Sequence, residues 1–511
     1  MAKKKRRSRF SRIRWGSMTW LILLVFVIVF AFLLLKFPII PNKWKFIVLG
    51  AVAVITALLG YFSFRNFKDF YSKKPVVSAL NILLSIVLLI CSIILPTVES
   101  GIRRVFDDVP ETVSTKINVY AMTTDYKSAH SDLFRSRGLI TDASLNNYAN
   151  KQFITQTSVD QENQAFALEK LQMMYNSKSL WINEQDTVWN AVNALYTAEG
   201  DALILNEAYV DLLTDTEEYS NFKEDTIVLY SFTREGESSS SKSEADLTQP
   251  FNIYIAGSDS REEGLTTVTR TDVNIIATVN PEKKTVILTS FPRDSYIANP
   301  ALGNGLDKLT HMGVYGIDNS LAALSGYMNA PLDNYVLVNF YTYKTIINAI
   351  GGVDIDNPYE FSAGSYTFEA TRIHLDGDSA LAYVRERKSL QGGDFNRNEH
   401  QVIVLRAILK KMLSPENIVN LNDVLNALSG TFMTNLSSDS IFRLVSEQID
   451  RPGNWNIISY HVTGSTGSEV TASMPGQLLS VVYPSQPQME FAVEQMNKLL
   501  ANEDVYQEKL P

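Results

Sequence analysis

The chain has 511 residues, of which 45% are hydrophobic and 20% are charged, and its formal net charge at pH 7 is −9. The charge is unevenly placed: residues 1–74 hold 15 Lys and Arg and one acidic residue, which leaves residues 75–511 with a net −23. An acidic body excludes the basic folded surface that a nucleic-acid partner requires. The single cysteine, Cys91, excludes disulfides and thiolate chemistry from the soluble part.

Three apolar stretches open the chain: Met18–Leu35, Trp44–Phe64 and Val76–Pro96. Each is near the length of about 20 residues that a bilayer-spanning helix needs, so we predict three transmembrane helices within residues 18–96. The basic tail 1–17 and the basic stretch Arg65–Lys74 are expected in the cytoplasm. Three lysines in the turn of residues 36–45 would then lie outside, against this rule. We predict a multi-pass protein of the cell membrane, with everything after the third span outside the cell.

Two further domains are predicted beyond the membrane. Residues 107–233 mix strand-like and helical segments and indicate a small extracellular α+β accessory domain without a catalytic constellation. The polar, Ser-rich run at 234–248 is typical of a strand-free linker. In residues 249–500 short strands alternate with helices, which predicts a three-layer α/β/α sandwich. The predicted helices of this sandwich are Ile317–Met328, Tyr341–Ile350, Glu399–Met412 and Ser438–Ile449.

Charged residues follow the apolar strands of the second domain at regular spacings. On a strand, residues two apart share a face, so Arg270 and Asp272 are expected to point the same way. We interpret Leu381–Arg387 as a strand as well, which would place Arg385 and Arg387 side by side. Two such arginines repel each other unless an anion lies between them. The pattern favours a phosphate-rich ligand that arrives with a divalent metal.

The strand-end carboxylates have two interpretations each. Asp259 could form a local Asx-turn, and Asp272 could pair with Arg270 across one face. Beside an arginine cluster, however, oxygen-only ligands suit Mg²⁺ or Mn²⁺, whereas zinc would need paired His or Cys. Arg293 and Asp294, after another strand, could bind each other or a phosphate.

A glycine-rich stretch precedes the predicted helix that carries Arg397 and Gln401. These two residues are four apart and therefore lie on one helical face, which Val404 and Ile408 continue with apolar side chains. Core packing is the ordinary explanation of such a stripe. The alternative is a helix with an anion-attracting start and an apolar continuation, which would suit a lipid with a pyrophosphate head.

Several blocks of the chain resemble, in order, the LytR–CpsA–Psr family of Gram-positive cell-envelope proteins. The blocks are Asn252–Arg261, Arg270–Asp294, Gly351–Pro358 and His374–Arg387, followed by Arg397 and Gln401. Ordered blocks are more specific than a lone motif. Three spans and an extra domain before the catalytic one are similar to the capsule-assembly (CpsA) branch of streptococci.

The resemblance implies an enzyme, a polyisoprenyl-pyrophosphate glycopolymer–peptidoglycan phosphotransferase acting on capsular polysaccharide or a similar anionic polymer. It implies that Asp259 and Asp272 bind Mg²⁺ or Mn²⁺. The residues that it places around the pyrophosphate are Arg270, Arg293, Arg385, Arg387, Arg397 and Gln401. Arg261 lies in a matching motif and is counted with them; Asp259, Arg270, Arg293 and Asp294 are the candidate catalytic residues, and Val404 and Ile408 the candidate lipid contacts.

The implied partners are a polyprenyl pyrophosphate-linked polysaccharide, peptidoglycan, the membrane and other capsule-assembly membrane proteins. Two other functions stay open at this point: a polyprenyl-pyrophosphate hydrolase, in which water replaces the sugar acceptor, and a non-catalytic membrane regulator of capsule synthesis. The general base is not assigned; Asp259, Asp294 or a metal-bound water could serve.

Overall fold

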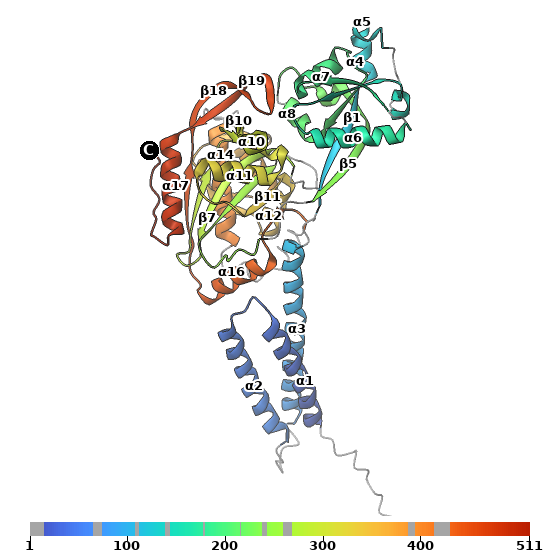
Figure 1. The fold of residues 1–511 in the computed structure, drawn as a ribbon. Helices are drawn as coiled ribbons and strands as arrows, with labels where there is room; N and C mark the ends of the chain where they lie inside the picture. Colours follow the sequence, from blue (N-terminus) through green and yellow to red (C-terminus); the bar gives the residue numbers. More distant parts are fainter. Residues whose placement is uncertain are drawn as a thin grey trace, which may run out of the picture.

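The computed structural model describes residues 15–64, 74–107, 112–137, 144–176, 179–214, 216–237, 243–258, 268–386, 394–412 and 430–511. Three parts follow one another in space: a foot of long helices, a larger sheet with its helices above it, and a smaller sheet beyond (Figure 1). We call the described residues of 112–237 the accessory unit and those of 243–511 the sandwich unit. The exact domain boundaries stay a prediction.

The foot consists of α1 (Trp15–Lys36), α2 (Asn42–Phe64) and α3 (Lys74–Asp107). All three are long and apolar enough to cross a membrane. Asn81 is buried between them, and its Nδ2 donates to Thr19 Oγ1 and Ser63 Oγ, both at 3.2 Å. The third helix is longer than predicted, because it continues through Pro96 to Asp107. This extension carries it to the sandwich unit.

Two contacts fasten the foot to the ends of a single helix, α16 (Ser438–Asp450). At its start, the Asp107 carboxylate accepts from Ser438 N at 3.0 Å and from Ser438 Oγ at 2.7 Å. At its end, Lys43 Nζ lies 2.6 Å from Asp450 Oδ1. Apolar residues of the foot, including Phe37 and Ile102, are buried in one cluster with residues of the sandwich unit. The α1–α2 turn therefore lies on the same side of the foot as the sandwich unit.

The accessory unit is built on a five-stranded sheet of order β3-β2-β4-β1-β5. Its strands are β1 (Thr112–Met122), β2 (Gln152–Gln156), β3 (Trp181–Gln185), β4 (Ala202–Asn206) and β5 (Thr226–Glu237). The helices α6 (Gln161–Met174) and α7 (Val188–Tyr196) pack into separate apolar clusters on the sheet. The mixture of strands and helices predicted for this region is confirmed.

The predicted linker is wrong at its beginning. Strand β5 continues to Glu237, so residues 234–237 are not strand-free. Arg234 pairs with Thr115 and Glu237 with Thr112 in the long antiparallel ladder with β1. Pairing with an extended partner strand overrides the polar composition of this segment, since every added residue satisfies backbone groups.

The sandwich unit has a six-stranded sheet of order β16-β11-β6-β7-β8-β17. Its strands are β6 (Phe251–Ser258), β7 (Thr271–Asn280), β8 (Thr285–Ser290), β11 (Tyr335–Val338), β16 (Met433–Thr434) and β17 (Asn456–His461). β7 runs antiparallel to β6 and β8, while β11 and β17 run parallel to their neighbours β6 and β8. The start of β7 therefore meets the ends of these four strands along one margin, which we call the site edge.

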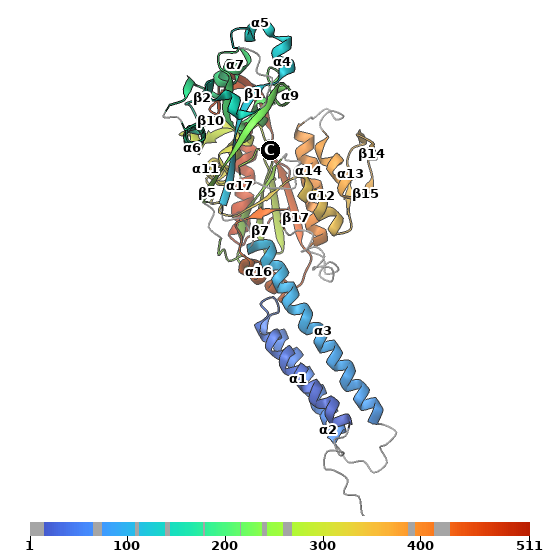
Figure 2. The ribbon, with the colours of Figure 1, turned by 90° about the vertical axis from the view of Figure 1, so that its right-hand side faces the viewer.

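Helices cover both faces of this sheet, as Figure 2 shows. On one face, α11 (Ile317–Met328) and α17 (Gln486–Leu500) pack against alternate residues such as Tyr254 and Ile276. On the other, α14 (Asp394–Met412) packs against the residues in between, such as Ile275. Two further helices, α12 (Phe340–Ala349) and α13 (Gly377–Arg385), lie beyond α14. The predicted three-layer α/β/α sandwich is confirmed.

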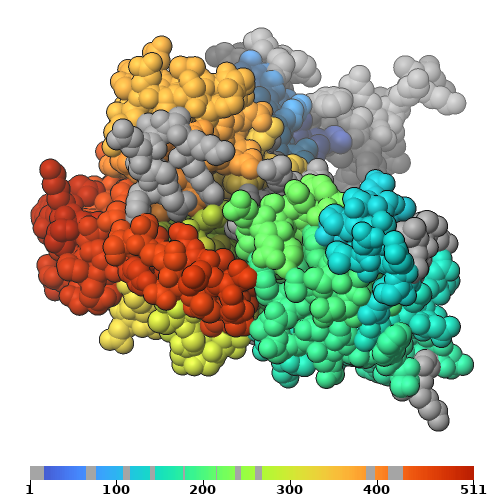
Figure 3. Space-filling model, turned by 90° about the horizontal axis from the view of Figure 1, so that it is seen from above, coloured from blue at the N-terminus to red at the C-terminus, as the bar shows by residue number. Residues whose placement is uncertain are grey.

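A hairpin and a short turn of the sandwich unit reach the accessory unit. The hairpin is β18 (Gly464–Thr471) with β19 (Met474–Pro484), and the turn is η6 (Gly313–Tyr315). Figure 3 shows the hairpin lying against the accessory unit. Met474 and Val314 are buried in the apolar cluster that also holds Trp189 and Leu203 of the accessory unit. The two units thus share one core cluster.

Candidate functional site

The site edge brings Arg270, Asp272 and Arg293 into direct contact. Arg293 Nη1 donates to Oδ1 and Oδ2 of Asp272 at 3.0 and 3.1 Å. Arg270 Nη2 reaches Asp272 Oδ1 at 3.4 Å, which confirms that Arg270 and Asp272 share a face. The cause is the sheet topology, because β7, which begins directly after Arg270, starts beside the end of β8, which Arg293 follows.

Two residues from other elements complete this cluster. Thr310, in the short helix α10 (Leu309–Met312), donates from Oγ1 to Asp272 Oδ1 at 3.3 Å. Arg397, in the first turn of α14, donates from Nη2 to the main-chain oxygen of Asp272 at 3.5 Å. Arg270, Asp272, Thr310 and Arg397 are all buried. Sequence reasoning missed Thr310, which carried no motif signal.

Guanidinium groups gather closely around Asp272 in this cluster. Arg270, Arg293 and Arg397 carry three positive charges around the single carboxylate of Asp272. Buried charges are costly unless they are paired, and guanidinium groups bind phosphate oxygens in a bidentate manner. A group of closely spaced guanidinium groups at a strand edge therefore suits a polyanionic ligand.

Asp294 lies beside the cluster and has a different partner. Lys308 Nζ is 3.1 Å from Asp294 Oδ1, whereas Arg293 Nε is 3.8 Å from Asp294 Oδ2. The main-chain oxygen of Asp294 accepts from Val482 N at 2.8 Å, which ties this loop to strand β19. Arg293 is thus directed to Asp272 more closely than to its neighbour, so the pairing of Arg293 with Asp294 is the weaker contact.

The predicted strand at Leu381–Arg387 is wrong. Residues 377–385 form helix α13, which begins at a capping box: Asp376 Oδ1 accepts from Ser379 N at 2.8 Å, and Ser379 Oγ accepts from Asp376 N at 2.9 Å. Arg385 ends this helix, so a shared strand face with Arg387 cannot be inferred. Arg387 lies outside the described residues.

Arg385 nevertheless lies at the site edge. Its guanidinium carbon is 4.4 Å from the centre of the Phe340 ring, and Phe340 opens α12 directly after β11. Strand β11 ends at Val338, which pairs with Gly257 at the end of β6. Arg385 is exposed, so its stacked guanidinium presents a charge to solvent at the same margin as the buried cluster.

The predicted metal ligands are described only in part. Asp259 and Arg261 lie outside the described residues. Among the residues that the structure describes, no group of three His, Cys, Asp or Glu side chains could hold a metal ion. Asp272 offers carboxylate oxygens, the donor type that Mg²⁺ prefers. Both oxygens accept from Arg293, so a cation at Asp272 would share the carboxylate with a guanidinium.

The two faces of α14 pack differently. Val404 and Ile408 are buried in the cluster formed with α12 and α13, away from the sheet. Val402, Leu405 and Leu409 instead meet the sheet, and the last two are only half-buried. Other half-buried apolar residues beside them are Ile255, Val273 and Val279. Apolar surface with partial exposure therefore lies between α14 and the sheet.

One buried histidine lies in the same helix. His400 Nδ1 is 3.2 Å from the main-chain oxygen of Tyr383, and its ring stacks on Phe361 at 4.8 Å between centres. Burial lowers the pKa of His400 to about 4. A neutral ring in an aromatic setting explains His400 as a structural residue.

The accessory unit also reaches the cluster, which the sequence did not reveal. Arg270 Nη1 donates at 2.8 Å to the main-chain oxygen of Asp211, in the short helix α8 (Val210–Thr214). Arg270 thus divides its two terminal nitrogens between the sandwich unit and the accessory unit. Every residue type has a main-chain oxygen, so this contact could not be predicted from the residue type at position 211.

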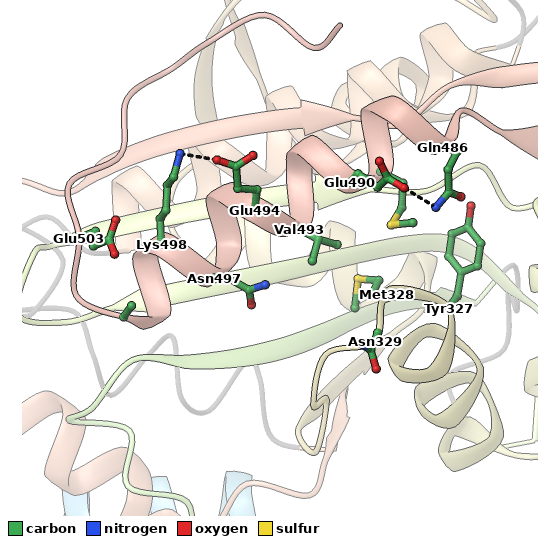
Figure 4. A pocket seen from close by; sticks show the side chains of 12 residues that line it. Tyr327, Met328, Asn329, Gln486, Glu490, Val493, Glu494, Asn497, Lys498 and Glu503 are labelled. Atoms are coloured by element: carbon green, nitrogen blue, oxygen red, sulfur yellow. Dashed lines mark hydrogen bonds and ion pairs between the residues drawn. The ribbon is translucent and has the colours of Figure 1, made fainter.

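A pocket away from this cluster lies between the end of α11 and helix α17 (Figure 4). Its lining includes Tyr327, Met328 and Asn329 from α11 and its C-cap, with Val493 and Asn497 from α17. None of the predicted site residues that the structure describes lines it. Its described lining mixes carboxylates with a lysine, Lys498, and includes no arginine.

Comparison with known families agrees with the order of the blocks. The model of the LytR_cpsA_psr family matches residues 218–482, just over half of the chain. This chain belongs to the LytR_cpsA_psr family. The match spans the whole arginine cluster described above, from Arg270 to Arg397.

Two curated relatives carry the name polyisoprenyl-teichoic acid–peptidoglycan teichoic acid transferase TagU. The protein of Enterococcus faecalis is 35% identical over 208 residues, which cover 40% of this chain and 68% of the relative. The protein of Bacillus mycoides is 32% identical over 246 residues, which cover 45% and 80%.

Solved structures of similar proteins include B. subtilis TagV, at 26% identity and a TM-score of 0.42. The likeness covers 50% of this chain and 99% of that one. A structure titled TagT bound to LI-WTA is 24% identical with a TM-score of 0.40, covering 51% and 94%.

Proposed function

We propose that this protein transfers a glycopolymer from a polyprenyl pyrophosphate carrier to peptidoglycan. The observation that carries the proposal is the grouping of Arg270, Arg293 and Arg397 around Asp272 at the site edge. The names of the TagU relatives support transfer of an envelope polymer to peptidoglycan. Capsular polysaccharide as the polymer, and other capsule-assembly proteins as partners, are narrower proposals that rest on the three-helix foot and accessory unit.

The arginines would act by holding the diphosphate and stabilising its charge. An acceptor hydroxyl of peptidoglycan would form a bond to the phosphorus that carries the glycan. The bridging P–O bond would break, and its electron pair would stay on the departing polyprenyl phosphate. Arg270, Arg293 and Arg397 are fixed by their contacts with Asp272, so they need little rearrangement as charge develops. Exposed Arg385 would meet the diphosphate from the solvent side.

Magnesium remains part of the proposal. The donor chemistry fits, because Mg²⁺ typically binds one or two carboxylates together with substrate phosphates. Asp272, with Asp259, would supply the carboxylates. When bound, the ion would neutralise phosphate charge. Asp294, whose carboxylate lies beside Lys308, is our candidate for accepting the proton of the acceptor hydroxyl.

The prenyl chain is proposed to lie between α14 and the sheet. Leu405 and Leu409 face the sheet and are half-buried, as expected for side chains that a lipid would cover. Val404 and Ile408, the lipid contacts proposed from the sequence, pack on the opposite side in the cluster with α12 and α13. We therefore propose a supporting role for that pair and direct contact for Leu405 and Leu409.

The location outside the cell rests on charge and geometry together. The α1–α2 turn and the sandwich unit lie on one side of the foot, so the basic tail lies on the other if α1 crosses the membrane. The positive-inside rule places that tail in the cytoplasm. The lysines of the turn do not oppose this orientation strongly, because Lys43 is paired with Asp450 and Lys45 Nζ donates to Leu35 O at 3.1 Å.

The test is reconstitution of the reaction with the full-length protein. A polyprenyl pyrophosphate-linked polymer and peptidoglycan should give polymer covalently bound to peptidoglycan and free polyprenyl phosphate in equal amounts. Arg293→Ala should abolish both products. Polyprenyl phosphate without peptidoglycan-bound polymer would indicate a hydrolase instead. Binding of the carrier without either product would indicate the non-catalytic regulator.

A further inference from the structure

The contact between Arg270 and Asp211 joins two units at the reactive edge. Arg270 Nη1 lies 2.8 Å from the main-chain oxygen of Asp211, and the arginine side chain is 6% exposed. Helix α8, which carries Asp211, lies on the side of the accessory unit that faces the sandwich unit (Figure 1). A buried arginine of the site is therefore held from outside its own unit.

The chemistry of this acceptor matters for phosphate binding. A main-chain oxygen is neutral, so it orients the guanidinium without cancelling its charge. A carboxylate in the same place would neutralise the arginine and compete with phosphate. Asp211 directs its own carboxylate elsewhere, to Lys223 Nζ at 2.9 Å, where both side chains are exposed. The contact thus orients Arg270 without adding the Asp211 carboxylate to that of Asp272.

Apolar packing fixes α8 in this position. Leu212 and Leu213 of α8 belong to the cluster that also buries Val314 and Met474 of the sandwich unit. Tyr209, directly before α8, meets Tyr315 edge to face at 6.4 Å between ring centres. The accessory unit is therefore docked through a shared core, not through surface contacts alone.

The same docking turn also contacts the backbone before Arg270. Gly313 O accepts from Thr269 N at 3.0 Å. A Cβ at Gly313 would lie 2.1 Å from Thr269 O, so glycine is required for this approach. Turn η6 thus packs Val314 into the accessory core and Gly313 against the residue preceding Arg270. A shift of turn η6 relative to the accessory unit would therefore also displace the backbone next to Arg270.

We propose that the accessory unit is a positioning element for Arg270, acting through the main-chain oxygen of Asp211. Docked, it holds Nη1 while Nη2 faces Asp272, which sets the plane of the guanidinium. The relevance of that plane for a diphosphate rests on the proposed function. By orienting Arg270, the accessory unit affects the affinity of the site for the head group of the carrier.

The experiment compares a docking variant with a matched core variant in the full-length protein. Val314→Ala loosens the shared cluster, whereas Leu171→Ala removes an equally buried side chain from the other accessory cluster, which holds no sandwich residue. Lys223→Ala removes the surface pair of Asp211 and leaves its main-chain oxygen in place. Affinity for geranyl pyrophosphate is measured by calorimetry on folded protein, in the native background and with Arg270→Ala.

The expected result is a several-fold loss of affinity in Val314→Ala and none in Leu171→Ala or Lys223→Ala. In the Arg270→Ala background, Val314→Ala should cost no further affinity, since the group that it misplaces is gone. Equal losses from Val314→Ala in both backgrounds, or no loss in the native one, would overturn the proposal.

A second readout does not depend on the ligand. Phenylglyoxal should modify Arg270 faster in Val314→Ala than in native protein or Leu171→Ala, as followed by mass spectrometry of the peptide. Equal modification rates would also overturn the positioning role. If native protein does not bind geranyl pyrophosphate, the proposed function fails, and the modification rates still decide whether the accessory unit holds Arg270.

Discussion

Arg293 Nη1 contacts both carboxylate oxygens of Asp272, at 3.0 and 3.1 Å. The same carboxylate is also reached by Arg270 and Thr310, so it organises the cations of the site edge. A carboxylate accepts at about four lone-pair positions, and these contacts use most of them. Asp272 is therefore a structural centre of the cluster as well as the proposed metal ligand.

This double role predicts that Asp272→Ala destabilises the fold. The change removes the Asp272 carboxylate from buried Arg270 and half-buried Arg293, a loss of about 3–5 kcal/mol in the free energy of unfolding. Asp272→Asn keeps one acceptor oxygen and should cost less. Urea unfolding of the two variants measures the difference. A native-like stability for Asp272→Ala would show that the arginines are not held by this carboxylate.

The sequence was informative where local periodicity decides the structure. Alternation from Arg270 onward predicts that Arg270 and Asp272 share a face, and the two side chains meet at the start of β7. The segment before Arg385 is a helix and not the predicted strand, and Asp376 and Ser379 carry the signal of its capping box.

Other features depend on tertiary structure alone. Thr310 and the main-chain oxygen of Asp211 reach the site through chain segments that no motif connects to it. The stripe of Val404 and Ile408 was recognised on α14, but one helical sequence offers two apolar faces. Which face meets the sheet is decided by how α12 and α13 pack, and the pattern alone does not contain that information.

Neighbouring residues of α14 allow a matched test of the lipid path. Leu405→Asn should weaken binding of a long-chain prenyl pyrophosphate and leave geranyl pyrophosphate nearly unaffected, because only a long chain reaches the α14–sheet surface. Val404→Asn, in the closed cluster with α12 and α13, should lower the melting temperature and change both affinities in parallel. The proposed path is wrong if the long-chain affinity of folded Leu405→Asn equals that of native protein.

Magnesium is tested most directly by binding. Affinity for geranyl pyrophosphate should fall on EDTA treatment and return on addition of Mg²⁺. The reason is that the ion would bind the protein carboxylate and the phosphate oxygens of the ligand together. In Asp272→Asn, added Mg²⁺ should no longer restore the affinity. Titration calorimetry with and without Mg²⁺ provides both measurements. The metal proposal does not survive if EDTA leaves the affinity unchanged.

Buried His400 and half-buried His461 predict a stability loss in acid. Burial lowers the pKa of His400 and of His461 from 6.5 to about 4 in the folded protein. Between these values the unfolded chain binds protons that the folded protein does not, so the free energy of unfolding falls as the pH falls from about 6.5 to about 4. Each residue contributes at most about 1.4 kcal/mol per pH unit.

The variant His400→Phe tests how much His400 contributes to the pH dependence of the free energy of unfolding. Denaturant unfolding from pH 7.5 to 4 should show a shallower slope for the variant, with a constant difference from native protein above pH 7. An unchanged slope below pH 6.5 would mean that His400 binds its proton equally in both states.

The ion pair of Lys43 with Asp450 predicts how the chain lies across the membrane. It joins the α1–α2 turn to the sandwich unit, so both must be on one face of the bilayer, and the basic tail on the other. A reporter enzyme that is active only outside the cell should therefore be active when fused after residue 110 and inactive when fused within Arg65–Lys74.

Lys43→Glu is the matched perturbation, because it places a like charge beside Asp450 without altering the spans. It should leave the reporter pattern unchanged but loosen the attachment of α16, seen as faster proteolysis near residue 450. Activity of the Arg65–Lys74 fusion outside the cell would invert the orientation and remove the site edge from the compartment that holds peptidoglycan.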